Sequence, residues 1–159
     1  MISRHFWLIS FSIFVSLVMA LVPLPIGIEA FRPDWVLLVL MYWSLALPHR
    51  VNIGIAWLTG LLMDLALGSP LGVHSLAYSI SIYITASNYQ KIRNFSVWQQ
   101  AFLIALFLAL YHLVQFWLSH FLIDIYFLPQ YLWPVLTGAL CWPWIFLLLR
   151  KYRRNFRIR

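Results

Sequence analysis

Long apolar stretches, separated by short breaks of polar residues and prolines, make up almost the whole chain. They predict six membrane-spanning helices at residues 6–24, 35–47, 51–67, 71–89, 97–121 and 133–149. A spanning helix needs about 20 mostly apolar residues, and these stretches lack the period-two alternation of a transmembrane barrel strand. The pattern therefore predicts an all-α integral membrane protein: a single membrane domain over residues 1–159, with a six-transmembrane-helix bundle and a basic tail at 150–159.

The breaks between the stretches predict how the helices are connected. Most of them hold only a few residues, so consecutive helices are expected to lie antiparallel and side by side. The first stretch is longer than the apolar core of a cleavable signal, about 7 to 15 residues, and is expected to be retained. Before the second helix, Pro33 suits the first helical position and Asp34 the first turn. The segment with Asp124, Pro129 and Gln130 is expected to lie along the membrane interface.

Charge is scarce and segregated, which adds an orientation. Charged residues are 9% of the chain and hydrophobic residues 64%, a composition that excludes a soluble globule. Short loops rich in Lys and Arg stay in the cytoplasm, so both termini are predicted there. That side then holds Arg4, Arg50, Lys91, Arg93 and the tail cations Arg150, Lys151, Arg153, Arg154, Arg157 and Arg159, while the outer side holds Arg32, Glu29, Asp34, Asp64 and Asp124.

The basic tail is interpreted as a membrane anchor. The formal charge of +7 would also suit nucleic acid, but no base-stacking motif accompanies it. Each basic residue near an anionic lipid surface contributes about 1 kcal/mol of attraction. A cytoplasmic partner that docks on the tail is the alternative.

Asp64 is the first functional candidate within the apolar stretches, because a carboxylate in a membrane is costly. It falls near the outer end of its helix, where the negative end of the helix dipole disfavours it. His74 is the nearest partner in sequence. We expect an Asp64–His74 contact that joins two helices, with a partner contact or a ligand role as the alternatives.

The third predicted helix carries a stripe of small and polar residues at intervals of four. Small residues allow two backbones to approach closely, and polar residues hydrogen-bond between helices in lipid. The matching positions on the fourth and fifth helices are expected to meet the stripe inside the bundle, although this face would also suit another protein's helix. The residues are Asn52, Ala56, Gly60, Asp64 and Gly68 in the stripe; Ser75, Ser79, Ser81 and Thr85 on the fourth helix; and His112, Gln115 and Ser119 on the fifth.

Aromatic residues are abundant, and most tryptophans fall near predicted helix ends, where indole rings favour the headgroup region. Trp142-Pro143-Trp144 differs, because Pro143 interrupts the hydrogen bonds of the sixth helix and should bend it. A bent helix flanked by two indoles suggests either a groove for a partner or ordinary helix contact.

Catalytic motifs are missing from the sequence. It has no G-x-S-x-G, H-E-x-x-H or G-x-x-x-x-G-K-[ST] segment. The five histidines are scattered, and the one cysteine, Cys141, has no nearby base. We therefore expect neither an enzyme nor a metal or cofactor site.

Several segments in order resemble a known family. They are Phe31-Arg32-Pro33-Asp34-Trp35, then Tyr42-Trp43, Leu47-Pro48-His49-Arg50-Val51-Asn52-Ile53-Gly54, Gly60 with Asp64, Gly68 and Leu71-Gly72, and Trp142-Pro143-Trp144-Ile145-Phe146. In sequence, spacing and chain length they resemble the rod-shape-determining MreD proteins of Gram-negative bacteria.

The resemblance implies an inner-membrane scaffold or regulator of the machinery that builds the lateral cell wall, and it implies no catalysis. Its implied partners are the single-span protein MreC and, directly or through MreC, the filament protein MreB, the glycosyltransferase RodA and a penicillin-binding transpeptidase. Contacts of Arg32, Asp34, Asp64, Trp142, Pro143 and Trp144 with a partner are expected from their positions.

A small-molecule-binding subunit of a membrane transporter is the competing interpretation. The family is thought to be similar in fold to the six-helix substrate-binding subunits of energy-coupling-factor transporters. Such a subunit would need an enclosed cavity with convergent polar residues, whereas a scaffold should show filled helix contacts and an exposed apolar groove.

Overall fold

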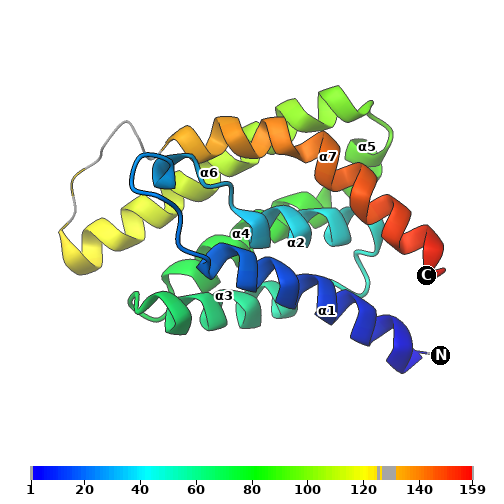
Figure 1. Cartoon of the computed structure of the whole chain (residues 1–159), viewed down its shortest axis with the longest axis horizontal. Helices are drawn as coiled ribbons and strands as arrows, with labels where there is room; N and C mark the ends of the chain where they lie inside the picture. The colour runs from blue at the N-terminus through cyan, green and yellow to red at the C-terminus, as the bar shows by residue number, and fades with distance from the viewer. Residues whose placement is uncertain (1, 125, 127–131, 159) are drawn as a thin grey trace.

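The computed structural model describes residues 2–124, 126 and 132–158, and in this part of the chain all regular structure is helical. The chain order is α1 (Ile2–Leu21), the short 3-10 helix η1 (Glu29–Phe31), α2 (Trp35–Ala46), α3 (Ile53–Leu67), α4 (Val73–Ser87), α5 (Tyr89–Arg93), α6 (Val97–Ile123) and α7 (Trp133–Asn155). The longer helices coincide with the six predicted stretches (Figure 1). Pro129, Gln130 and Arg159 lie outside the described residues.

Three helices are long and apolar enough to cross a membrane, at residues 4–21, 97–123 and 133–155, and α2 and α3 are shorter apolar helices. Among the described residues, exposed large apolar side chains cover α1, α3, α6 and α7. Such a surface is stable in lipid and not in water. The protein is therefore a membrane protein.

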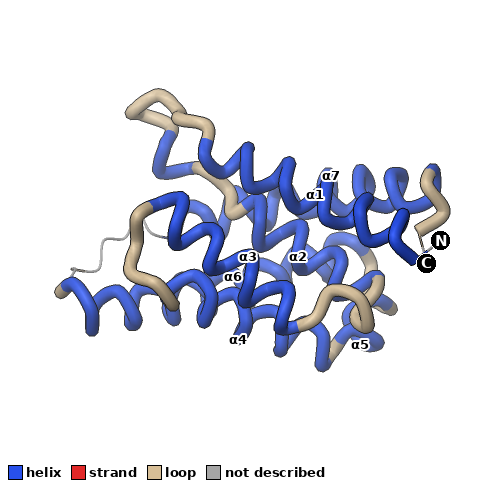
Figure 2. Tube along the Cα trace, turned by 90° about the horizontal axis from the view of Figure 1, so that it is seen from below, coloured by secondary structure: helices blue, strands red, loops and turns tan. Residues whose placement is uncertain are grey.

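Helix α2 forms the centre of the bundle. Every residue from Val36 to Leu45 is buried, as expected for a helix that is apolar on all sides. In Figures 1 and 2, α2 lies between α1 and α7 on one side and α3, α4 and α6 on the other. Because α2 is surrounded by other helices, it is not a lipid-facing span, and its length is also below that of a spanning helix.

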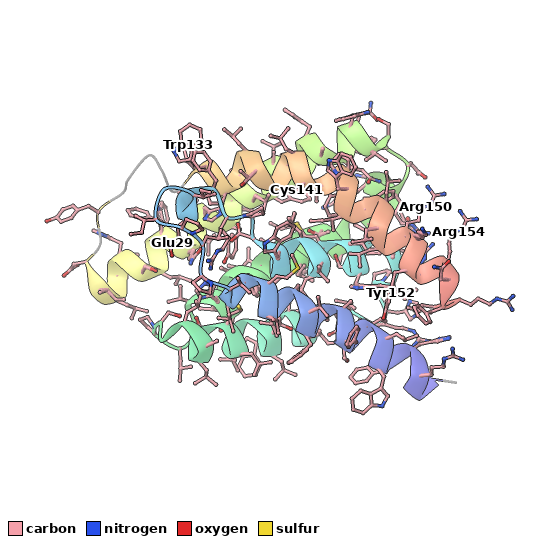
Figure 3. The ribbon with its side chains drawn as sticks, in the orientation of Figure 1. Glu29, Trp133, Cys141, Arg150, Tyr152 and Arg154 are labelled. Atoms are coloured by element: carbon pink, nitrogen blue, oxygen red, sulfur yellow. The ribbon has the colours of Figure 1, made fainter. Side chains whose placement is uncertain are left out.

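Consecutive long helices run in opposite directions, so the N-terminus and C-terminus lie at the same end of the bundle (Figure 1). The tail cations Arg150 and Arg154 lie at that end, and Glu29 lies toward the other (Figure 3). The basic and acidic residues that are separated along the sequence therefore also lie at opposite ends of the bundle.

Several helix ends differ from the prediction. The segment expected as a separate tail continues α7 to Asn155, because Lys and Arg are good helix formers and a positive φ follows only at Arg157, after the helix has ended. The expected linker between the fourth and fifth stretches contains α5. Pro143 lies inside α7, which changes direction near its middle in Figure 1.

The predicted start of α2 is wrong in detail. The helix begins at Trp35 with Asp34 as N-cap and no acidic residue in the first turn, and the Asp34 side chain makes no cap hydrogen bond. Pro33 accordingly lies before the helix. The Asp34 carboxylate instead accepts a hydrogen bond from His112 on α6, an interhelical contact that the local pattern does not show.

Candidate functional site

Asp64 is completely buried at the C-terminal end of α3, where it holds the start of α4. One oxygen accepts from the backbone N–H of His74 at 3.0 Å and contacts His74 Nδ1 at 2.8 Å. The Ser69 hydroxyl donates to this same oxygen at 2.9 Å, and the other oxygen accepts from Gly72 N–H at 3.0 Å. The expected contact between Asp64 and His74 is therefore present, and the carboxylate also serves as an N-cap supplied by another helix.

This arrangement resolves the dipole problem noted from the sequence. The negative end of the α3 dipole disfavours a carboxylate at Asp64, whereas the N-terminal N–H groups of α4 favour one. Gly72, the N-cap of α4, has no side chain to cap the helix. Asp64 supplies the missing acceptor.

The small-residue stripe of α3 faces α4, not a free surface. A Cβ on Gly60 would lie 2.3 Å from Ser75 Cα and 2.5 Å from Ser75 N, so the two backbones touch there. Ala56, Gly60 and Asp64 are buried in this contact. Asn52 instead caps the start of α3 by accepting from Gly54 and Ile55, and Gly68 ends the helix in the left-handed region.

The serine and threonine side chains of α4 are small enough to allow this close contact. The hydroxyls of Ser79, Ser81 and Thr85 donate to backbone carbonyls four residues earlier in α4 itself. The Ser75 hydroxyl is buried without a hydrogen-bond partner among the described residues. The α3–α4 contact is thus held by close backbone approach and by Asp64.

A second carboxylate–histidine pair joins α2 and α6. His112 Nε2 lies 2.7 Å from Asp34 Oδ2, and one turn later Gln115 Nε2 lies 3.2 Å from His74 Nε2. The polar face predicted for the fifth stretch therefore turns inward, where it connects both pairs.

Arg32 is engaged with the end of α1. Its guanidinium donates to the carbonyl oxygens of Ala20, at 2.6 Å, and Val22, through a short contact. These carbonyls belong to the last turn of α1 and the residue after it, where helical partners are missing. Arg32 thus fastens the loop before α2 to the C-terminal end of α1.

These groups border a cavity of about 540 Å³ at the end of the bundle opposite the termini. Its walls come from α1, the loop with η1, α2, α3, α4, α6 and α7, with both polar and aromatic side chains among them. The polar residues that line it are Glu29, Arg32, Asp34, His74, Tyr78, Tyr111, His112, Gln115 and Ser119, and the aromatic ones include Trp35 and Phe116.

A second hollow, of about 810 Å³, lies between α1 and α3 and is mainly apolar. Aromatic side chains of α1 form one wall, and aliphatic side chains of α3 form the other. At its end toward the termini are His49 and Arg50. The apolar lining consists of Phe6, Trp7, Ile9, Phe11, Ile13, Phe14 and Leu17 on α1 and Ile55, Leu58 and Leu62 on α3. We call this the α1–α3 groove.

Other candidates from the sequence lie apart from both hollows. Trp142 is completely buried, whereas Trp144 is 77% exposed, so only Trp144 is available to a partner, and neither lines the cavity or the groove. Arg150, Lys151, Arg153 and Arg154 lie in the last turns of α7, and Arg157 follows the helix. Among the described residues, no group of three or more His, Cys, Asp or Glu is arranged to hold a metal ion.

Sequence reasoning missed the aromatic part of the cavity. Tyr78 lies one turn after His74, and Tyr111 directly precedes His112; their rings stack with centroids 5.4 Å apart. The four-residue spacing between His74 and Tyr78 places both on one face of a helix, and it could have pointed to Tyr78. No sequence pattern pointed to the α1–α3 groove, because its apolar residues cannot be distinguished by pattern from residues that face lipid.

The fold and these contacts define an all-helical membrane protein with one buried and one half-buried carboxylate–histidine pair beside a cavity and with an apolar groove on its side. A family model for the rod shape-determining protein MreD matches residues 1–152. The Rod shape-determining protein MreD of Haemophilus influenzae is 42% identical over 157 residues, which are 99% of this chain and 96% of that protein. The chain belongs to the MreD family, and its role lies in cell shape. No solved structure matches it.

Proposed function

We propose that this protein is a non-enzymatic scaffold of the bacterial inner membrane that binds MreC and supports lateral peptidoglycan synthesis by the elongation machinery. MreB, RodA and a penicillin-binding transpeptidase would be reached directly or through MreC. Membership of the MreD family supports the role in cell shape. The α1–α3 groove is the observation that carries the contact with MreC.

The groove suits one transmembrane helix. Its α1 wall runs from Phe6 to Leu17, about three helical turns at 1.5 Å per residue. Few contacts join α1 to α3 across it, so an inserted helix would meet side chains from two directions. Because little of the chain extends beyond the helices, a partner must be recognised chiefly through such faces.

The small-residue stripe that offered an alternative docking face is already covered by α4. A partner helix cannot reach Gly60 without displacing Ser75. The opposite face of α3, with Leu58 and Leu62, borders the groove. The proposed contact with MreC therefore moves to that face.

The test is co-purification of MreC with the full-length protein carrying Leu62→Trp. The larger side chain fills the groove without entering the bundle, because Leu62 is exposed. We expect at least about tenfold less MreC, equivalent to about 1.4 kcal/mol of binding free energy. The variant should also fail to restore rod shape in cells depleted of the protein.

Leu140→Trp is the matched control. Leu140 is an exposed leucine on α7 that borders neither hollow, so the same enlargement there should leave MreC binding and cell shape unchanged. Equal binding by both variants, at equal membrane levels, would show that the groove is not the docking surface.

The cavity supports a second candidate function, a small-molecule-binding subunit of a transporter. It has the convergent polar lining that such a subunit needs. Purification from mild detergent discriminates the two: cell-wall synthesis proteins among the bound partners support the scaffold, and an ATPase module supports the transporter.

A further inference from the structure

We propose that the cavity binds a small organic cation, namely a primary ammonium or guanidinium group carried on an apolar body. This inference concerns the cavity alone and is independent of the proposed contact with MreC at the groove. It rests on the size of the cavity, on its charge and on the aromatic side chains in its wall.

The size suits a small ligand. The volume of about 540 Å³ falls within the roughly 300–1,000 Å³ of small-molecule sites. The wall comes from several helices, so most of it is held in place before any ligand arrives. The Phe31 and Trp133 rings meet 5.2 Å apart next to it, where η1 lies against the start of α7 (Figure 3).

The charge of the wall favours a cation. Glu29 and Asp34 both line the cavity. Asp34 Oδ2 is taken by His112, whereas no donor to Asp34 Oδ1 is found within the described ranges of the chain. Behind His74, the buried Asp64 is paired with the imidazole and does not itself line the cavity.

Arg32 offsets one of the two carboxylates that line the cavity. It is the one lysine or arginine among the described lining residues, and both terminal nitrogens of its guanidinium are engaged by carbonyl oxygens of the α1 end. The terminal nitrogens of Arg32 are therefore turned to the α1 backbone, its buried Nε has no hydrogen-bond partner among the described residues, and the two carboxylates Glu29 and Asp34 outnumber this one permanent cation in the wall.

The aromatic side chains add a second attraction of the same sign. Tyr78 and Tyr111 are stacked on each other and almost fully buried, so the ring surface in the wall comes mainly from the half-buried Trp35 and Phe116. Aromatic faces attract ammonium and guanidinium groups through the ring quadrupole, and the attraction grows when water is excluded. The rings also accommodate an apolar body, so the ligand class is an amphipathic cation.

The test compares four probes with one ring and different head groups: benzylamine, benzamidine, benzyl alcohol and benzoate. Binding to the purified full-length protein in nanodiscs is measured by saturation-transfer NMR and by the shift in unfolding temperature. We expect benzylamine and benzamidine to bind and to raise the unfolding temperature, and benzyl alcohol and benzoate to bind at least about tenfold more weakly.

Two variants locate the binding. Asp34→Asn and Glu29→Gln should each weaken benzylamine binding, Asp34→Asn by about tenfold or more. If Asp34→Asn fails to fold because it disturbs His112, Glu29→Gln remains informative, since Glu29 is exposed. Asp124→Asn is the control, a carboxylate at the end of α6 that does not line the cavity.

The natural cation can be a free amine or a basic side chain of an associated protein. A photo-crosslinking residue in place of Ile26, at the cavity and 97% exposed, captures a protein in cells in the second case. In the first case, native mass spectrometry of the gently extracted protein shows a small adduct that Asp34→Asn removes.

Equal binding of benzoate or benzyl alcohol overturns the proposal. So does benzylamine binding that survives both Asp34→Asn and Glu29→Gln. Absence of binding by all four probes, together with no adduct and no crosslink from position 26, overturns it as well.

Discussion

Asp64 shows how one residue can hold two helices together inside a membrane. Its carboxylate accepts from the Ser69 hydroxyl, two backbone N–H groups and the His74 side chain. A buried carboxylate is tolerated when each oxygen is hydrogen-bonded. Because the residue is completely covered, the role of Asp64 in partner binding can only be indirect, through the position of α4.

Replacing Asp64 should therefore destabilise the protein in a graded way. Asp64→Ala leaves several buried donors without an acceptor, and removing one partner of a buried charged pair costs about 3–5 kcal/mol. Asp64→Asn keeps one acceptor oxygen and should cost less. Thermal unfolding in detergent measures both, with Asp124→Asn as the exposed control. Unchanged folding and MreC binding in Asp64→Asn would remove Asp64 as an essential contact.

Gly60 and Gly138 provide a matched test of close helix approach. A Cβ on Gly60 would collide with the Ser75 backbone, whereas a Cβ on Gly138 would meet the Cδ1 end of the flexible Leu108 side chain at 2.6 Å. Overpacking costs about 1–3 kcal/mol. We expect Gly60→Ala to lower the unfolding temperature clearly more than Gly138→Ala. A larger loss for Gly138→Ala would contradict the α3–α4 geometry.

At the scale of elements, the loop between α1 and α2 is held by side chains of its own and of neighbouring helices. Arg32 binds the end of α1, Asp34 binds His112 on α6, and Phe31 contacts Trp133 on α7. Loops usually run free over a surface, but this one is connected to three helices. It thereby forms part of the cavity wall.

Arg32→Lys should loosen this loop while keeping its charge. A lysine ammonium is a single point of contact and cannot reproduce the two-carbonyl geometry of the guanidinium. Hydrogen exchange should quicken at residues 20–34 and stay unchanged in α4. Unaltered hydrogen exchange at the end of α1 would show that the contact of Arg32 with the Ala20 and Val22 carbonyls does not stabilise this end of the helix.

At the scale of the whole molecule, charge divides the bundle into two ends. The N-terminus, the α2–α3 connection, α5 and the end of α7 lie at one end (Figure 1) and bring Arg4, Arg50, Lys91, Arg93 and the α7 cations there. The cavity, with Glu29 and Asp34 in its wall, lies at the other end. Cytoplasmic segments are those rich in Lys and Arg. The cavity should accordingly open on the outer side.

Reporter fusions test this orientation. Alkaline phosphatase inserted after Ile26 should be active, and green fluorescent protein fused after residue 159 should fluoresce, because the first folds only outside and the second only in the cytoplasm. An active phosphatase fused at the C-terminus would contradict the proposed cytoplasmic C-terminus and, with it, the even number of membrane crossings.

By itself, the sequence determined the helical class, the approximate helix positions and the segregation of charge, because these follow from local apolar length and from where cations interrupt it. It also pointed to the Asp64–His74 contact, since both residues flank one short turn. Only the tertiary structure decided that the Asp34 side chain pairs with His112 and does not cap its own helix, that the Gly60 face is covered by α4, that Trp142 is buried, and that Tyr78 and Tyr111 stack in the wall of a cavity. Those contacts join residues far apart in the chain, and an apolar position reads the same in sequence whether lipid, another helix or a groove lies beside it.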